Sequence, residues 1–169
     1  MTRRQNNAVV RIVRGGIIAA LYVALTYLSS LLGLSGMNVI QLRLSEALCI
    51  LPVFLPEAIP ALTLGCLISN LLTGAHAMDI ILGSIATLIG ALGTYFIFKA
   101  LKGRLPFLAS LPPVIANALI VPFVLIFAYG LEGGYFFFML TVGLGELISA
   151  SVLGTLLYYA LKKTVIFDI

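Results

Sequence analysis

Long apolar runs fill most of this sequence, and they restrict its fold more than any other feature. They cover residues 15–34, 77–101, 111–129 and 136–161, and a helix needs about 20 such residues to cross a bilayer. Only 9% of the 169 residues are charged, whereas a soluble domain has about 25%. This number of charges is too small to cover a soluble surface. Lipid must therefore cover most of the exterior. The sequence predicts one all-α membrane domain over residues 1–169.

The number of crossings depends on residues 46–73. This stretch is long for one helix and short for two, and Pro52, Pro56 and Pro60 interrupt it. Proline has no N–H to donate, and its ring disrupts the helical turn before it. We therefore expect either one kinked crossing or two short ones that meet near Glu57 and Pro60.

The distribution of basic residues favours two crossings. Membrane proteins keep lysine and arginine in their cytoplasmic loops. All the basic clusters share one side only if residues 46–73 cross twice; the clusters are Arg3–Arg4–Arg11–Arg14, Lys99–Lys102–Arg104 and Lys162–Lys163. We expect a six-helix bundle in the cell membrane with both termini cytoplasmic, and no nucleic-acid partner. The approximate helices are 15–34, 46–57, 60–74, 77–101, 111–129 and 136–161, and the second is short or kinked.

This topology collects polar side chains at the outer end of the bundle. Arg43, Glu46 and Asp79 bring unlike charges together there, beside further polar residues at positions Asn38, Gln41, Asn70, His76 and Glu132. Asp79 also stands near a predicted helix start, where free N–H groups favour a carboxylate. Solvation or helix capping is therefore an alternative to ligand binding for Asp79. The lone His76 has no partner at metal-ligand spacing, and we expect no metal or cofactor.

Glu146 lies roughly 15 Å inside the last apolar run at the helical rise. A charge at the bilayer centre costs about 2.5–3.5 kcal/mol on insertion scales, so this side chain must face the bundle interior. Asn117, in the fifth run, is a weaker case of the same kind. Either residue can instead serve as a structural hydrogen bond between helices.

Small residues form a stripe on the first predicted helix. Gly16, Ala20 and Ala24 recur every fourth residue, which lets another helix approach closely. The approaching helix can belong to this chain or to another subunit. No phosphate-binding loop, zinc motif or nucleophile motif is present, so the sequence indicates a non-enzymatic subunit that draws energy from partners.

Five blocks in order resemble the QueT family, whose members are substrate-binding S-components of energy-coupling factor (ECF) transporters, a kind of ABC importer. They are QLRLSEAL (41–48), LGCLISNLL (64–72), DIILGSIATLIGALGTY (79–95), LPPVIANALIVP (111–122) and VGLGELISASVLG (142–154). The resemblance implies six helices and a site near the extracellular side for a queuosine precursor, a 7-deazaguanine base. It also implies docking on a membrane T-component with two ATPases, through a small-residue stripe that Ala20 and Ala24 match.

The chemistry of a guanine-like base then suggests ligand contacts. Glu46 and Asp79 are candidates to accept its N–H groups, and Arg43, Gln41 and Asn70 are candidates for its carbonyl and remaining polar atoms. Glu146 would close the floor of the pocket. A flat ring needs an aromatic platform, for which Tyr135, Phe136 and Tyr95 are available. An S-component for a different vitamin, a structural membrane subunit and, least favoured, an intramembrane enzyme are the alternatives.

Overall fold

The computed structural model describes residues 3–34 and 42–164, with side chains described from Ala8 onward. In these residues every regular element is a helix, which confirms the all-α fold. The elements are α1 (Arg3–Leu31), the 3₁₀ helix η1 (Leu44–Val53), α2 (Ala58–Leu72), α3 (Ala77–Ala100), α4 (Pro106–Ala109), α5 (Leu111–Phe127), α6 (Tyr135–Glu146), the π-helix η2 (Leu147–Leu153) and α7 (Gly154–Lys162).

Four helices of the described residues are long and apolar enough to cross a membrane. They are Ala8–Leu31, Ala77–Ala100, Pro106–Phe127 and Tyr135–Lys162, the last combining α6, η2 and α7. Both η1, with 10 residues, and α2, with 15, are shorter. At their helical rises they extend roughly 20 Å and 22 Å, against about 30 Å of hydrocarbon. The chain is thus a multi-pass membrane bundle, and crossing by η1 and α2 stays a prediction.

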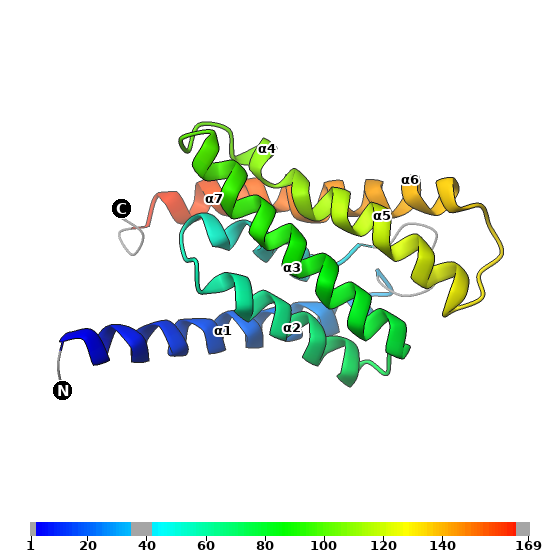
Figure 1. The fold of residues 1–169 in the computed structure, drawn as a ribbon, viewed down its shortest axis with the longest axis horizontal. Helices are drawn as coiled ribbons and strands as arrows, with labels where there is room; N and C mark the ends of the chain where they lie inside the picture. The colour runs from blue at the N-terminus through cyan, green and yellow to red at the C-terminus, as the bar shows by residue number, and fades with distance from the viewer. Residues whose placement is uncertain (1–2, 35–41, 165–169) are drawn as a thin grey trace.

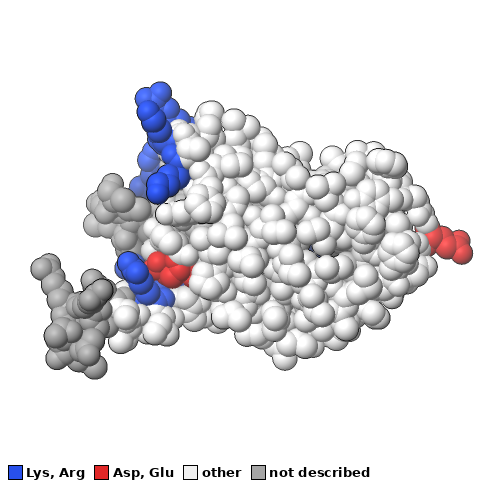
Figure 2. Space-filling view, in the orientation of Figure 1, with Lys and Arg blue, Asp and Glu red and all other residues white. Residues whose placement is uncertain are grey.

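The elements run back and forth between two ends of the molecule (Figure 1). The N- and C-terminal ends of the described chain lie together at one end, here called the termini end. The α2–α3 turn (residues 73–76) and the α5–α6 loop (residues 128–134) lie at the other, the loop end. On the face shown in Figure 2, lysine and arginine atoms gather at the termini end.

Side-chain hydrogen bonds hold η1 against α1. The Leu44 N–H donates to Ser29 Oγ at 2.9 Å, and the hydroxyls of Thr26 and Ser45 are 2.9 Å apart. Proline explains why the segment then breaks: Pro52 lies inside η1 and Pro56 stands between η1 and α2. On the termini side of the break, Arg14 of α1 reaches Glu57 at 3.9 Å.

Helices α3 and α5 approach closely because two glycines face two prolines. A Cβ added at Gly90 would lie 2.8 Å from Pro113 Cα, and one at Gly93 would lie 2.5 Å from Pro112 Cβ. No real side chain tolerates such distances, so this crossing requires glycine at both positions. The crossing fixes the start of α5 against the middle of α3.

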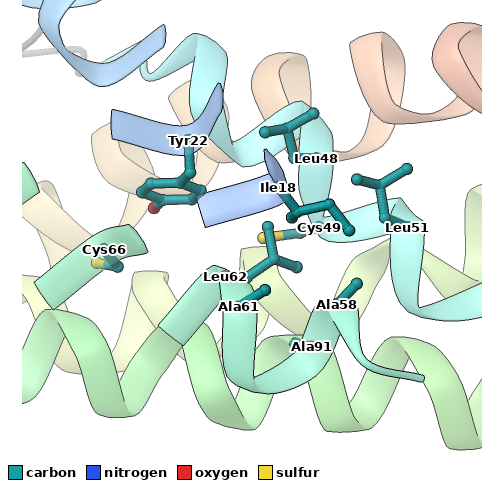
Figure 3. Packing of buried hydrophobic residues seen from close by; sticks show 10 residues of the cluster. All are labelled: Ile18, Tyr22, Leu48, Cys49, Leu51, Ala58, Ala61, Leu62, Cys66 and Ala91. Carbon is teal, nitrogen blue, oxygen red and sulfur yellow. The ribbon is translucent and has the colours of Figure 1, made fainter. Parts of the chain in front are cut away.

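The main hydrophobic cluster lies where α1, η1 and α2 meet, with one contribution from α3 (Figure 3). Its members are Ile18, Tyr22, Leu48, Cys49, Leu51, Ala58, Ala61, Leu62, Cys66 and Ala91. Three of them, Tyr22, Cys49 and Cys66, bring polar atoms into this apolar core. Those atoms lie beside the charged residues described next.

Candidate functional site

Arg43 and Asp79 form an ion pair at the loop end. Arg43 immediately precedes η1, Asp79 lies in the first turn of α3, and Nη2 of the arginine is 3.8 Å from Oδ2 of the aspartate. Burial disfavours the charge on Arg43, but Asp79 and the other acidic groups around it offset this and raise the pKa of Arg43 above its ordinary value. The guanidinium therefore stays charged at any physiological pH.

Asp79 is held by two further side chains. The Tyr129 hydroxyl donates to Oδ2 at 3.0 Å and accepts from the His76 N–H at 3.2 Å, while Asn70 Nδ2 donates to the Asp79 carbonyl oxygen at 3.3 Å. Burial raises the pKa of Tyr129, and the Asp79 charge acts in the same direction, so the phenol keeps the proton that it donates. The side-chain cap of α3 is His76 Nδ1, which accepts from the Met78 N–H, and not Asp79.

Glu46 lies deeper, with only 2% of its surface exposed. One carboxylate oxygen accepts a hydrogen bond from the Tyr22 hydroxyl, and the other accepts from the Cys49 thiol at 3.1 Å. Cys49 reaches it because residues three apart align along a 3₁₀ helix. The 3₁₀ geometry of η1 therefore places the Glu46 carboxylate and the Cys49 thiol on the same side of the helix.

Glu146, the last residue of α6, lies on the other side of Glu46 from α1 and is 6% exposed. It lies beside the Asn117 side chain and within electrostatic range of Glu46 and Arg43. Yet Glu146 Oε2 and Asn117 Nδ2 are both buried and have no hydrogen-bond partner among the described residues. The π-helix η2 starts at the next residue, Leu147. Such segments are rare in helices and are common at functional sites.

Together these residues form what we call the acid cluster. It consists of Arg43, Glu46, Asp79 and Glu146, with Tyr22, Asn70, Asn117 and Tyr129 around them. Among the described residues it opposes one guanidinium to three carboxyl groups. Burying carboxyl groups without matching cations is costly, so the cluster is suited to a ligand that brings hydrogen-bond donors or a positive charge.

The structure brings together five of the residues that the sequence analysis selected, namely Arg43, Glu46, Asn70, Asp79 and Glu146. Gln41 lies outside the described residues. Tyr135 packs instead on α5: its hydroxyl donates to the Leu119 carbonyl oxygen at 2.9 Å, and its ring centroid is 4.8 Å from that of Phe123.

The other suggested aromatic platforms also lie away from the acid cluster. Phe136 is 73% exposed on the outside of the bundle. Tyr95 lies roughly 24 Å along α3 from Asp79 at the helical rise, near the termini end. That distance excludes Tyr95 as a platform for a ring bound at the acid cluster.

Sequence reasoning missed Tyr22 and Tyr129. Tyr22 lies in an apolar helix where nothing distinguishes it from a core aromatic. Tyr129 had a usable signal, because it follows the fifth apolar run on the side where Asp79 was expected. Its hydroxyl, at the end of a membrane span, would be within reach of a polar cluster at the same end.

The small-residue stripe of α1 faces away from the rest of the bundle. Gly16, Ala20 and Ala24 are all exposed, whereas Ile18, Tyr22 and Thr26 of the same helix are buried. A Cβ added at Gly16 would meet nothing within 4 Å. No described helix of this chain therefore packs on the stripe, which leaves it open to lipid or to another subunit.

The fold and the buried polar cluster define a class: a multi-pass helical membrane protein with a polar site at one end of its bundle. The sequence matches the QueT transporter family over residues 12–163, and the chain belongs to that family. It is 42% identical over 78 residues to the queuosine precursor transporter QueT of Lactococcus lactis subsp. cremoris (strain MG1363). The aligned part covers 46% of this chain and 45% of that relative, so it spans about half the length of each. No solved structure matches the chain.

Proposed function

We propose that this chain is the S-component of an ECF-type importer and that it captures a queuosine precursor, a 7-deazaguanine base, from outside the cell. The observation that carries the proposal is the excess of buried carboxyl groups in the acid cluster, which extends inward from the loop end. Family membership supports transport, and the printed name of the Lactococcus relative supports the substrate.

The chemistry of the base suits the cluster. A guanine-like edge presents a ring N–H and an exocyclic amine beside a carbonyl, and a carboxylate accepts two such N–H groups at once. Arg43 or Asn70 can donate to the carbonyl. A precursor with an aminomethyl group would also bring an ammonium ion, which would offset one surplus carboxylate. We assign Glu46, Asp79 and Glu146 as the groups that accept from the ligand.

The distribution of charge supports capture from outside. Lysine and arginine gather at the termini end (Figure 2), and the positive-inside rule assigns that end to the cytoplasm. The acid cluster extends inward from the loop end, where Asp79 lies in the first turn of α3 and Arg43 and Tyr129 lie next to the ends of η1 and α5. We therefore place the substrate site on the extracellular side of the cell membrane.

Energy would come from partner subunits. The exposed stripe of Gly16, Ala20 and Ala24 offers a flat surface on which a helix of a membrane T-component can pack. Two ATPase subunits bound to that component would then drive release of the ligand inside. In this proposal the chain itself is a binding subunit and not an enzyme.

A structural subunit is the second candidate, because Glu46 and Asp79 already have partners within the chain. To separate the two, the purified full chain is incubated with 7-aminomethyl-7-deazaguanine, guanine, biotin and riboflavin and examined by native mass spectrometry. We expect retention of the deazaguanine alone. Retention of a vitamin would replace the substrate assignment, and no retention of any compound would favour the structural role.

A further inference from the structure

A hollow with two lysines in its lining lies at the termini end, away from the acid cluster. Its volume is about 350 Å³, near the lower limit for ligand pockets. It lies between the end of η1 and the end of α3, and its lining is Val53, Tyr95, Phe98, Lys99, Lys102 and Gly103. Nothing in the proposed transport function uses this hollow.

Two lysines supply its charge. The ion pairs found among the described residues, Arg14–Glu57 and Arg43–Asp79, involve neither Lys99 nor Lys102. Lys99 Nζ lies 6.0 Å from the centre of the Tyr95 ring. Among the described residues, none that lines the hollow is acidic. An anion entering the hollow would therefore meet two ammonium groups and no described carboxylate competitor.

The backbone of Lys102 has an uncommon conformation. Its φ is +51°, the left-handed region that side-chain-bearing residues rarely adopt, and the next residue, Gly103, has φ +73°. A lysine in the last turn of a helix is explained by the helix dipole alone, which accounts for Lys99. The dipole does not require a lysine in a strained turn at the rim of a hollow.

Aromatic side chains brace the neighbouring elements. The Tyr158 ring stacks on Phe54 with centroids 5.1 Å apart and meets the edge of Phe98 at 5.6 Å. Lys162 Nζ is 5.8 Å from the Tyr158 ring. Phe98, which lines the hollow, is thus packed against an aromatic residue of α7.

We propose that this hollow binds the phosphate group of an anionic phospholipid headgroup in the leaflet at the termini end. Lysine binds phosphate as a point charge, and basic pockets between membrane helices on the cytoplasmic side bind anionic headgroups. A lipid fits better than free phosphate because Val53, Tyr95 and Phe98 line the hollow beside the two lysines and offer apolar surface to acyl chains.

The test is native mass spectrometry of the full chain in detergent with equal amounts of phosphatidylglycerol and phosphatidylcholine. We expect preferential retention of phosphatidylglycerol. The double variant K99Q/K102Q should lose roughly ten- to thirtyfold of this preference, since each lysine near an anionic surface contributes about fivefold. K163Q is the matched control, because Lys163 is exposed at the same end and does not line the hollow. The charge-conserving K99R/K102R variant should restore the preference.

Equal preference in K99Q/K102Q and K163Q would overturn the site. A competition arm separates the two sources of phosphate: millimolar inorganic phosphate should leave the bound phosphatidylglycerol in place. Displacement by phosphate at that concentration would overturn the lipid assignment in favour of a soluble phosphate compound.

Discussion

Arg43 and Asp79 are separated in the chain by η1 and α2, yet their side chains meet at the loop end with Nη2 3.8 Å from Oδ2. The pair is flanked by two more carboxyl groups, Glu46 and Glu146, that interact with the same guanidinium. Arg43 thus interacts with all three carboxyl groups of the acid cluster. Changing its nearest carboxylate should alter both the charge offered to a ligand and the position of the arginine.

Asp79→Asn keeps the side-chain shape and removes the charge. We expect affinity for the deazaguanine to fall about ten- to a hundredfold, because hydrogen bonds to a charged group contribute about 1.5–3 kcal/mol. Isothermal titration calorimetry on the purified variant measures this. Glu132→Gln is the matched control, since Glu132 is an exposed carboxylate in the α5–α6 loop. An equal change in both variants would mean that only the general charge of the loop end matters.

Tyr129→Phe removes one hydroxyl from Asp79 Oδ2 and from the His76 N–H. We expect a stability loss of about 1 kcal/mol together with weaker ligand binding, because the carboxylate loses the donor that orients it. Tyr135→Phe removes a hydroxyl of the same kind from the Leu119 carbonyl, where no cluster residue is involved. Thermal unfolding should respond to both changes, and affinity only to the first. If Tyr135→Phe weakened binding as much as Tyr129→Phe, the site would extend toward α6.

Glu146→Gln tests whether Glu146 binds the ligand or only forms a structural hydrogen bond between helices. The amide removes a carboxyl group buried near Glu46, so the ligand-free protein should unfold at the same or a higher temperature, while ligand affinity falls about tenfold. A structural hydrogen bond would give the reverse: lower stability and unchanged affinity. Glu57→Gln is the control, since Glu57 pairs with Arg14 outside the cluster.

Gly83 gives the cluster the space it needs. A Cβ added there would lie 3.2 Å from both Asn70 Nδ2 and Asp79 Oδ1. Gly83→Ala should therefore displace one of these groups and weaken binding. At Gly143 the added Cβ would lie 3.5 Å from Ala118 Cβ, an ordinary contact. Gly143→Ala should raise stability by about 0.5–1 kcal/mol and leave affinity unchanged, as calorimetry and thermal unfolding would show. Unchanged affinity in Gly83→Ala would place the ligand away from Asn70 and Asp79.

The stripe on α1 predicts a loss of assembly without a loss of binding. Ala20→Leu with Ala24→Leu adds bulk to the exposed face on which a partner helix packs in the proposed complex. We expect the variant to lose co-purification with the T-component and ATPases and to keep its ligand affinity. Ala160→Leu, on the exposed side of α7, should retain the partners. Partner loss in both variants would point to a general effect of added bulk.

The sequence predicted the helical fold and much of the acid cluster, for physical reasons. Apolar runs long enough to cross a membrane can only be helices here, and polar residues next to their ends share one end of the bundle once the chain direction alternates. Arg43, Glu46 and Asp79 followed from that alternation alone. The expected position of Glu146 inside the bundle followed from the cost of exposing a carboxylate to lipid.

What the sequence did not predict depends on local geometry. The first helix begins at Arg3, ahead of the apolar run at Gly15, because a helix can extend beyond the membrane with polar residues. The 3₁₀ form of η1 and the π-helix after Glu146 leave no periodic signal in an apolar segment. The polar role of Tyr22 could not be predicted for a similar reason. In the sequence its ring resembles any core aromatic, and only the hydrogen bond from its hydroxyl to Glu46 reveals that role.

The central claim is that this chain binds a 7-deazaguanine base by itself, and calorimetric titration of the purified chain tests it most directly. With no T-component or ATPase present, we predict saturable binding of 7-aminomethyl-7-deazaguanine, one molecule per chain, and much weaker binding of guanine. No heat of binding for a folded chain, or equal affinity for guanine and the deazaguanine, would contradict the account.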